Sequence, residues 1–273
     1  MHLTVATADG PMRVDLGQPL DLSIPYDFAG EQPSHFDAPR ASASALHAGS
    51  FVGDVRLGGS CNCEELRLIP HCNGTHTECV GHVTSERVSV HERFSSGLAL
   101  ALLLSVEATA ASSSHESTVP PAAPGDRLIT ARSLEQAWKR QPSAGVTALV
   151  LRTLPNDAGK RTRRYEAHPP PPFLSIPAAE FIVAWGVEHL LVDLPSLDRT
   201  HDQGKLSVHR IFWGLPPGSS NHAQARRPHA SVTELIFVPD SITDGRYLLD
   251  LQVAPFLSDA APSRPILYRL QRP

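Results

Sequence analysis

The sequence predicts a mixed α/β fold in a single domain, and three observations lead to this class. Apolar runs typical of buried strands recur at residues 99–106, 146–151 and 189–194. A helical segment lies between the second and third runs, and the order strand, helix, strand favours a parallel crossover. The length of 273 residues is enough for one domain with its own apolar core, so we expect residues 1–273 to form one unit.

The first half of the chain is expected to contain short strands separated by turns. The turn Ala8-Asp9-Gly10-Pro11 predicts a hairpin. The predicted segments are strands at 3–6, 12–16, 22–24 and 65–69, irregular chain at 29–50, a strand or short helix at 99–106, and a flexible Ala/Ser/Pro-rich loop at 107–124.

The second half is expected to alternate helices and strands. Ser133 is a candidate helix cap, Ser175 and Pro177 open another helix, and Gly186 lies near the end of that helix. The predicted segments are helices at 134–139, 175–186 and 206–213, strands at 146–151 and 189–194, and short strands between 235 and 268.

Composition excludes several classes of function. Lysine and arginine number 24 against 28 acidic residues, and the net charge of −4 argues against nucleic acid or an anionic membrane as partner. The apolar runs are shorter than the roughly 20 residues that cross a bilayer. The first residues lack the pattern of a secretory signal, so we expect a cytoplasmic protein whose four cysteines are thiols or ligands.

The densest chemical signal lies at residues 71–82. Imidazole, carboxylate and thiol groups are the donors that bind zinc or manganese. The candidates in this segment are His71, Cys72, His76, Glu78, Cys79 and His82. The alternative is a cluster of solvent-exposed histidines, and a zinc site of four thiols (adding Cys61 and Cys63) has a spacing that fits no zinc ribbon.

Spacing limits which of these side chains can share an ion. In an extended chain Cys72, Glu78 and His82 point to one side, as does His76. Positions 72 and 82 would lie roughly 33 Å apart in such a chain, so the segment must bend, and Gly74 or Gly81 could take a positive φ there. Cys72 points to the same side of an extended chain as His76 and Glu78, which favours it as a ligand. Imidazole is the more frequent ligand in proteins, which favours His71. We prefer Cys72.

The segment resembles the H-x-G-T-H-x-D-x-P-x-H signature of the cyclase family of metal-dependent hydrolases, which includes bacterial kynurenine formamidase and isatin hydrolase. Gly74-Thr75-His76 matches in full, and His82 matches the last histidine. Three positions depart from the signature: Glu78 replaces its aspartate, Val80 its proline, and Cys72 its first histidine, with His71 displaced by one.

Later stretches extend the resemblance over most of the chain. Residues 149–153 resemble the family's strand ending in Arg-Thr, and residues 178–198 resemble its helix, strand and D-x-x-S-x-D turn. His209 falls where the family carries a distal ligand histidine, and Glu234 resembles its partner glutamate.

The resemblance implies a swivelling β/β/α fold and a site for one or two divalent ions. His76 and Glu78 would be ligands, with Cys72 or His71 as a third. His209 and Glu234 would complete the site, and His82 would be the acid/base catalyst. A Cys72 thiolate would favour zinc, with manganese possible.

The function implied by the resemblance is hydrolysis of a small molecule at an amide, lactam or ester carbonyl, with an N-formyl-aryl amide favoured. The alternatives are an isatin-type lactam hydrolase and a catalytically silent metal-binding protein of the same fold. A homo-oligomer is also expected from the resemblance. The turn around Ser196 lacks a nucleophile elbow, which argues against a Ser-His-Asp hydrolase.

Overall fold

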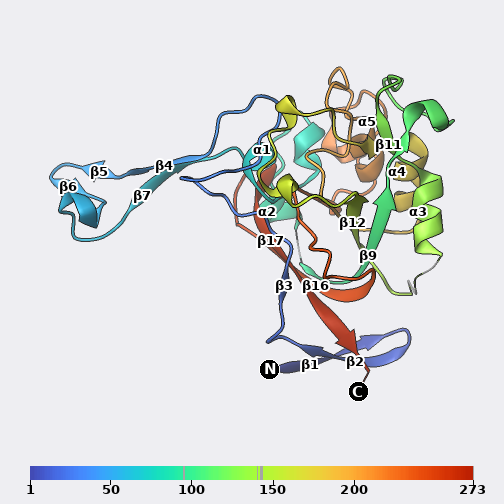
Figure 1. Cartoon of the computed structure of the whole chain (residues 1–273), viewed down its shortest axis with the longest axis horizontal. Helices are drawn as coiled ribbons and strands as arrows, with labels where there is room; N and C mark the ends of the chain where they lie inside the picture. Colours follow the sequence, from blue (N-terminus) through green and yellow to red (C-terminus); the bar gives the residue numbers. More distant parts are fainter. Residues whose placement is uncertain (95, 140, 142–143, 273) are drawn as a thin grey trace.

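The computed structural model describes residues 1–94, 96–139, 141 and 144–272. It is a mixed α/β structure, as predicted. Figure 1 shows a compact body that contains most helices and strands, a long two-stranded arm projecting from it, and an N-terminal hairpin beside the chain's C-terminus. None of the helices in these described ranges combines the length and apolarity needed to cross a membrane.

A closed barrel forms the centre of the body. Its strands follow the order β17-β16-β9-β12-β14-β15-β8, and β8 pairs with β17 to complete the ring. The barrel strands are β8 (His76–Glu78), β9 (Leu98–Glu107), β12 (Ala148–Leu154), β14 (His189–Val192), β15 (Ser231–Glu234), β16 (Gly245–Val253) and β17 (Ala260–Gln271). The parallel strands β9, β12, β14 and β15 meet the antiparallel strands at two places, where β9 pairs with β16 and where β15 pairs with β8.

The parallel half contains the predicted crossover. β12 pairs in parallel with β9 and with β14, and Leu149 lies opposite Leu102 and Leu190. The run at 99–106 is therefore a strand, which resolves the ambiguity between strand and helix. Its side chains alternate between two apolar cores, so each face of β9 is buried.

The two apolar cores lie on opposite faces of the barrel wall. One contains Leu103, Val150 and Leu191 and no helical residue, and it fills the barrel interior. The other contains Leu102, Leu149 and residues from the helices that cover the outside of the barrel. The helices of the chain are α1 (Pro70–Asn73), α2 (Val90–Arg93), α3 (Ala131–Trp138), α4 (Ile176–Ala184) and α5 (Ser207–Trp213).

The helix boundaries follow their capping residues. Ser175 caps α4 by accepting a hydrogen bond from the Ala178 N–H, as predicted, and Gly186 takes a φ of 73° just after this helix. The cap of α3 differs from the prediction. Thr130 is its N-cap, and Ser133 occupies the third helical position, where the two residues form a reciprocal capping box.

The arm is the main departure from the predicted elements. Residues 29–50, expected to be irregular, contain two of its strands, and Ser42 pairs with Arg67 at its base. The arm contains β4 (Ser42–Ala45), β5 (His47–Ala48), β6 (Phe51–Val52) and β7 (Glu64–Arg67). None of these described residues belongs to an apolar core, so the arm is held mainly by its own strand pairing.

The remaining strands lie at the margins of the body. The predicted N-terminal hairpin is confirmed, with Leu3 opposite Val14. These strands are β1 (His2–Thr7), β2 (Gly10–Asp15), β3 (Leu20–Asp21), β10 (Thr109–Ala110), β11 (Arg127–Ile129) and β13 (Phe173–Leu174). The 107–124 loop begins with β10, and its flexibility stays a prediction.

Candidate metal centre

Strand β8 carries two of the predicted ligands and places both on one side. Successive side chains of a strand alternate between its faces, so His76 and Glu78 point the same way. His76 lies opposite Glu234 of β15 in the strand register, which brings the Glu234 carboxylate to the same face. Thr77 points to the other face, where its hydroxyl lies 2.8 Å from that of Thr233.

Thr75 holds the start of β8 in place. Its side chain accepts a hydrogen bond from the Ile24 N–H at 2.6 Å and donates one to the Leu235 carbonyl. Gly74 is needed because of space and not because of its φ, which is 175° and extended. A Cβ at this position would lie 2.8 Å from the ring of Tyr26. The expectation of a positive φ at Gly74 is therefore wrong.

His71 reaches the site from α1, and this changes the preferred ligand. Residues 70–73 form a helical turn, so the parity of an extended chain does not apply to Cys72. The His71 Nδ1 lies 3.0 Å from Glu78 Oε2. Cys72 is in none of the potential ligand groups of the described residues, and burial raises the pKa of its thiol to about 11. The preference for Cys72 over His71 is thus reversed.

Helix α5 supplies His209, as predicted. The Asp198 carboxylate accepts hydrogen bonds from the N–H groups of Val208 and His209 in the first turn of this helix. The same carboxylate lies 2.7 Å from His209 Nδ1. One buried aspartate therefore caps the helix and fixes the orientation of the imidazole, so that Nε2 faces the cluster.

His82 and Asp259 form the more exposed side of the site. His82 lies on a 3₁₀ turn directly after β8, and its Nδ1 is 3.3 Å from Asp259 Oδ2. The same oxygen lies 2.9 Å from His71 Nε2. Each of these three side chains is between a quarter and a third exposed, whereas His76, Glu78 and His209 are buried. This side of the cluster is accordingly the one a small molecule can reach.

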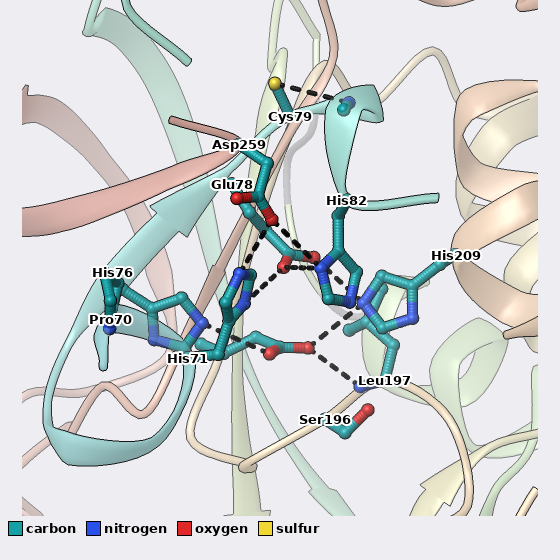
Figure 2. Close-up of polar contacts among 12 residues, drawn as sticks. Pro70, His71, His76, Glu78, Cys79, His82, Ser196, Leu197, His209 and Asp259 are labelled. Carbon is teal, nitrogen blue, oxygen red and sulfur yellow. Dashed lines mark hydrogen bonds and ion pairs between the residues drawn. The ribbon is translucent and has the colours of Figure 1, made fainter. Parts of the chain in front are cut away.

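Glu78 lies at the centre of the arrangement (Figure 2). Its Oε1 is 3.0 Å from His209 Nε2, and its Oε2 is 3.0 Å from His71 Nδ1 and 3.7 Å from His82 Nδ1. Glu234 links two further imidazoles, with its oxygens 3.5 Å from His76 Nε2 and 3.3 Å from His209 Nε2. Three overlapping groups of donor atoms have spacings suited to a metal ion: His71/His82/Asp259, His71/His76/Glu78 and Glu78/His82/His209.

The ring nitrogens of two histidines are arranged as in metal ligands. His76 donates its Nδ1–H to the Gly74 carbonyl at 3.1 Å, and His209 donates Nδ1–H to Asp198. When the rings are neutral, this tautomer leaves a lone pair on both Nε2 atoms, facing the cluster. These two nitrogens and both oxygens of Glu78 are buried and have no well-aligned hydrogen bond in the protein. Such a donor set fits a divalent cation.

The electrostatics lead to the same conclusion. Burial alone would raise the pKa of Glu78, but His82 and His209 outweigh it and hold this pKa well below its ordinary value. Burial alone would lower the pKa of His209. The nearby carboxylates of Glu78 and Asp198 outweigh burial and raise this pKa well above its usual range. Burial also opposes the rise for His71, yet Asp259 and Glu78 raise its pKa to about 10. In the absence of metal, protons on the imidazoles balance the carboxylates, and a cation would replace them.

The structure thus brings together the imidazoles and carboxylates predicted from the sequence, from elements far apart in the chain. The gathered residues are His71, His76, Glu78, His82, His209 and Glu234. All four cysteines are free thiols, and none joins a potential ligand group within the described residues, which leaves the four-thiol zinc site without support.

Sequence reasoning missed the roles of two aspartates. Asp198 ends the D-x-x-S-x-D turn, and its carboxylate accepts hydrogen bonds from two backbone N–H groups of α5. Its contact with His209 could have been suspected from the D-x-x-S-x-D stretch. Asp259 belongs to no motif, and its place follows only from the pairing of β17 with β8, in which Ala260 lies opposite Glu78.

Comparisons with known proteins identify the family and the fold. The profile of a family described as "Putative cyclase" matches residues 14–199. Among solved structures, the chain is similar to a predicted metal-dependent hydrolase from Bacillus stearothermophilus, with 13% identity, a TM-score of 0.55, and coverage of 92% of this chain and 98% of that one. No curated protein matches the sequence.

Two further solved structures share the fold. One is a novel cyclase, with 14% identity, a TM-score of 0.58, and coverage of 93% of this chain and 89% of that one. The other is isatin hydrolase A from Labrenzia aggregata bound to benzyl benzoate, with 12% identity, a TM-score of 0.58, and coverage of 92% and 93%. These likenesses confirm the predicted single-domain, cyclase-like fold.

Proposed function

The chain belongs to the cyclase family, and from that membership we propose that it is a metal-dependent hydrolase of small molecules. The observation that supports this best is the buried set of unpartnered donors formed by His76 Nε2, His209 Nε2 and the Glu78 carboxylate. Solved structures of the same fold include a predicted metal-dependent hydrolase and an isatin hydrolase. We propose the same general chemistry here.

His71, His76 and Glu78, one of the groups with a spacing suited to a metal ion, would hold the cation, with His209 and Glu234 completing the site for one ion or two. A bound divalent ion supplies a Lewis acid that polarises a carbonyl and makes water acidic enough to ionise near neutral pH. Since Cys72 lies outside the donor set, its thiolate gives no reason to favour zinc over manganese. Imidazole and carboxylate ligands suit both metals.

His82 is the proposed acid/base catalyst. Its Nδ1 faces the Asp259 carboxylate at 3.3 Å, which orients the ring and leaves Nε2 to exchange protons. The ring is a quarter exposed, so a substrate at the cluster can approach it. Nε2 would accept a proton from the attacking water and deliver it to the leaving amine or alcohol.

The proposed scissile group is an amide, lactam or ester carbonyl. An N-formyl-aryl amide is favoured because of the resemblance to formamidases in the sequence signature. A lactam of the isatin type is the second candidate, and the observation that favours it is the fold shared with isatin hydrolase A.

Metal analysis combined with turnover tests this function. We expect the purified protein to contain near-stoichiometric zinc or manganese and to hydrolyse formanilide, isatin or phenyl acetate in a chelator-sensitive manner. The variant Glu78→Gln should lose metal and turnover, because it removes the carboxylate at the centre of the cluster. Glu107→Gln, at the exposed end of β9, is the matched control and should retain both.

The other outcomes separate the alternatives. Firmly bound metal without turnover on any of the three probes would favour the catalytically silent protein of the same fold. A Glu78→Gln variant that retains full metal content would remove the central ligand from the proposal.

A further inference from the structure

A small cavity beside the metal centre contains polar groups that the proposed reaction does not use. Its volume is about 230 Å³, and its lining includes His35, Phe36, Tyr165, Pro171 and Thr200. His35 is 1% exposed, and neither of its ring nitrogens has a hydrogen-bond partner in the protein. The buried Thr200 hydroxyl also lacks a partner. Two such groups lining one cavity indicate that it receives a polar ligand.

The segment that carries His35 is fastened on both sides. The Ser34 N–H donates to the Arg163 carbonyl, and the Tyr165 N–H donates to the Ser34 carbonyl, each at 3.0 Å. The Glu166 carboxylate accepts hydrogen bonds from the Ser34 hydroxyl at 3.1 Å and from the Asp37 N–H at 3.0 Å. The position of His35 is therefore fixed by hydrogen bonds of the residues on either side of it.

The backbone beside His35 is strained. Phe36 and Asp37 have φ values of 57° and 52°, in the left-handed region that side chains other than glycine rarely adopt. Such strain persists only where the surroundings enforce it, and it is concentrated at functional sites. Here it turns the chain directly after His35, so that His35 and Phe36 both line the cavity.

Two connections place the cavity next to the metal cluster. Tyr165 packs in one apolar cluster with Leu235, the residue after Glu234. On the other side, the Leu197 N–H donates to Glu234 Oε1 at 2.9 Å, and the chain then runs a few residues to Thr200. The Glu234 carboxylate also acts electrostatically on His35, so the cavity lies on the Glu234 side of the cluster.

The residues that line the cavity indicate which charge and polarity a ligand would have. No lysine or arginine lines the cavity, whereas the carboxylates of Asp37 and Glu166 do, which disfavours an anion. Burial lowers the pKa of His35, so its ring is neutral. A neutral imidazole and a hydroxyl each offer one donor and one acceptor, and they complement a group that has both.

We propose that this cavity is a specificity subsite in which His35 and Thr200 hydrogen-bond a neutral carboxamide or hydroxyl substituent of the substrate. The rings of Phe36, Tyr165 and Pro171 form its apolar walls and would hold the substituted ring. The volume is somewhat above the roughly 150 Å³ of a cavity that holds benzene, so one small ring fits. This inference rests on the proposed function for the position of the scissile carbonyl, but the binding of the substituent can be tested separately.

The first test measures binding without turnover. Calorimetry or ligand-observed NMR would follow benzamide binding to the metal-loaded protein, to His35→Phe and to Thr200→Val. We expect binding to the wild type and a loss of about 10-fold in affinity in each variant, the factor that one hydrogen bond of ordinary net strength supplies. Metal content and melting temperature should be unchanged, and Thr200→Val serves if His35→Phe does not fold.

The second test measures selectivity. Formanilide and 3-formamidobenzamide carry the same scissile group and differ by the carboxamide. We expect the carboxamide to raise kcat/KM by about 10-fold, mainly through KM, in the wild type and to give no advantage in His35→Phe. The readout is the ratio of kcat/KM for the two substrates, measured within each protein.

The outcomes separate the subsite from the function. Benzamide binding that depends on His35, without turnover of either formanilide, supports the subsite and refutes the hydrolase. Turnover of both formanilides with no carboxamide preference, and with equal benzamide binding by wild type and variants, refutes the subsite. A crystal structure with benzamide in which only a water bridges His35 and Thr200 would also refute it.

Discussion

At the scale of single residues, the candidate metal centre depends on which ring nitrogen each histidine directs inward. His76 and His209 both use Nδ1 to donate to an oxygen outside the cluster. His71 differs, because carboxylates lie close to both of its nitrogens, and Glu78 would have to give up its contact with Nδ1 if that atom bound metal. His82 is closest to carboxylates through Nδ1 alone. The four imidazoles therefore have unequal roles.

The variant His82→Ala tests that division. We expect it to retain metal, because the His71, His76 and Glu78 group remains, and to lose about 10²–10⁴-fold in kcat through loss of the proton-transfer group. Metal content by mass spectrometry and turnover of formanilide measure the two effects. His91→Ala, on the exposed side of α2, is the matched control and should change neither. Loss of metal from His82→Ala would make His82 a ligand instead of the catalyst.

At the scale of secondary-structure elements, a buried ion pair holds two parallel strands together. Lys160 Nζ lies 2.7 Å from Asp193 Oδ2 and donates to the Thr153 carbonyl at 2.7 Å. Asp193 also accepts a hydrogen bond from the Thr153 N–H. Thr153 belongs to β12 and Asp193 directly follows β14, so the pair fastens the ends of both strands. The D-x-x-S-x-D stretch that leads to Asp198 starts at this point.

Removing the lysine should destabilise the fold strongly. We expect Lys160→Met to lower the free energy of unfolding by about 3–5 kcal/mol, because it leaves the Asp193 carboxylate buried without its partner. Lys139→Met is the control, since its pair with Glu135 is exposed and should contribute less than about 1 kcal/mol. Urea denaturation of both variants measures the difference, and equal losses would contradict this account.

The elements also show how far the sequence could predict the structure. The buried strands β12 and β14, and the helix cap at Ser175, depend on local patterns and were predictable, whereas periodicity left β9 open between a strand and a helix. The helical turn at α1 was not, because four residues contain too little periodicity to distinguish it from a strand, and the ligand preference for Cys72 depended on that distinction. Asp259 was missed because its contact with the cluster depends on barrel closure. Residues that belong to a motif could be identified from the sequence, whereas the contacts of Asp198 and Asp259 with the histidines were missed.

At the scale of the whole molecule, the barrel and the arm are separate in their packing. Figure 1 shows the arm extending away from the body, and among the described residues none of the arm's strands contributes to an apolar core. Val55, Leu57 and Leu66 of the arm are more than half exposed. The stability of the body should accordingly depend little on the arm.

Deletion of the arm tests this independence. We expect a variant that joins Ser42 to Arg67 by a short Gly-Ser linker to retain its metal content and to melt within a few degrees of the full chain. These two residues pair at the base of the arm, so the linker spans a short distance. A large drop in melting temperature would show that the arm supports the barrel. Light scattering on both samples tests the homo-oligomer that the family resemblance implies.

The pairing of β8 with β17 has a consequence for the order of events during synthesis. His76 and Glu78 come early in the chain, but their strand joins β17, which the ribosome makes after all the other barrel strands. Asp259, which touches two of the imidazoles, arrives at the same late stage. The nascent chain therefore carries His76 and Glu78 without the strand that closes the barrel beside them, and we expect the complete site to form only after β17 has emerged.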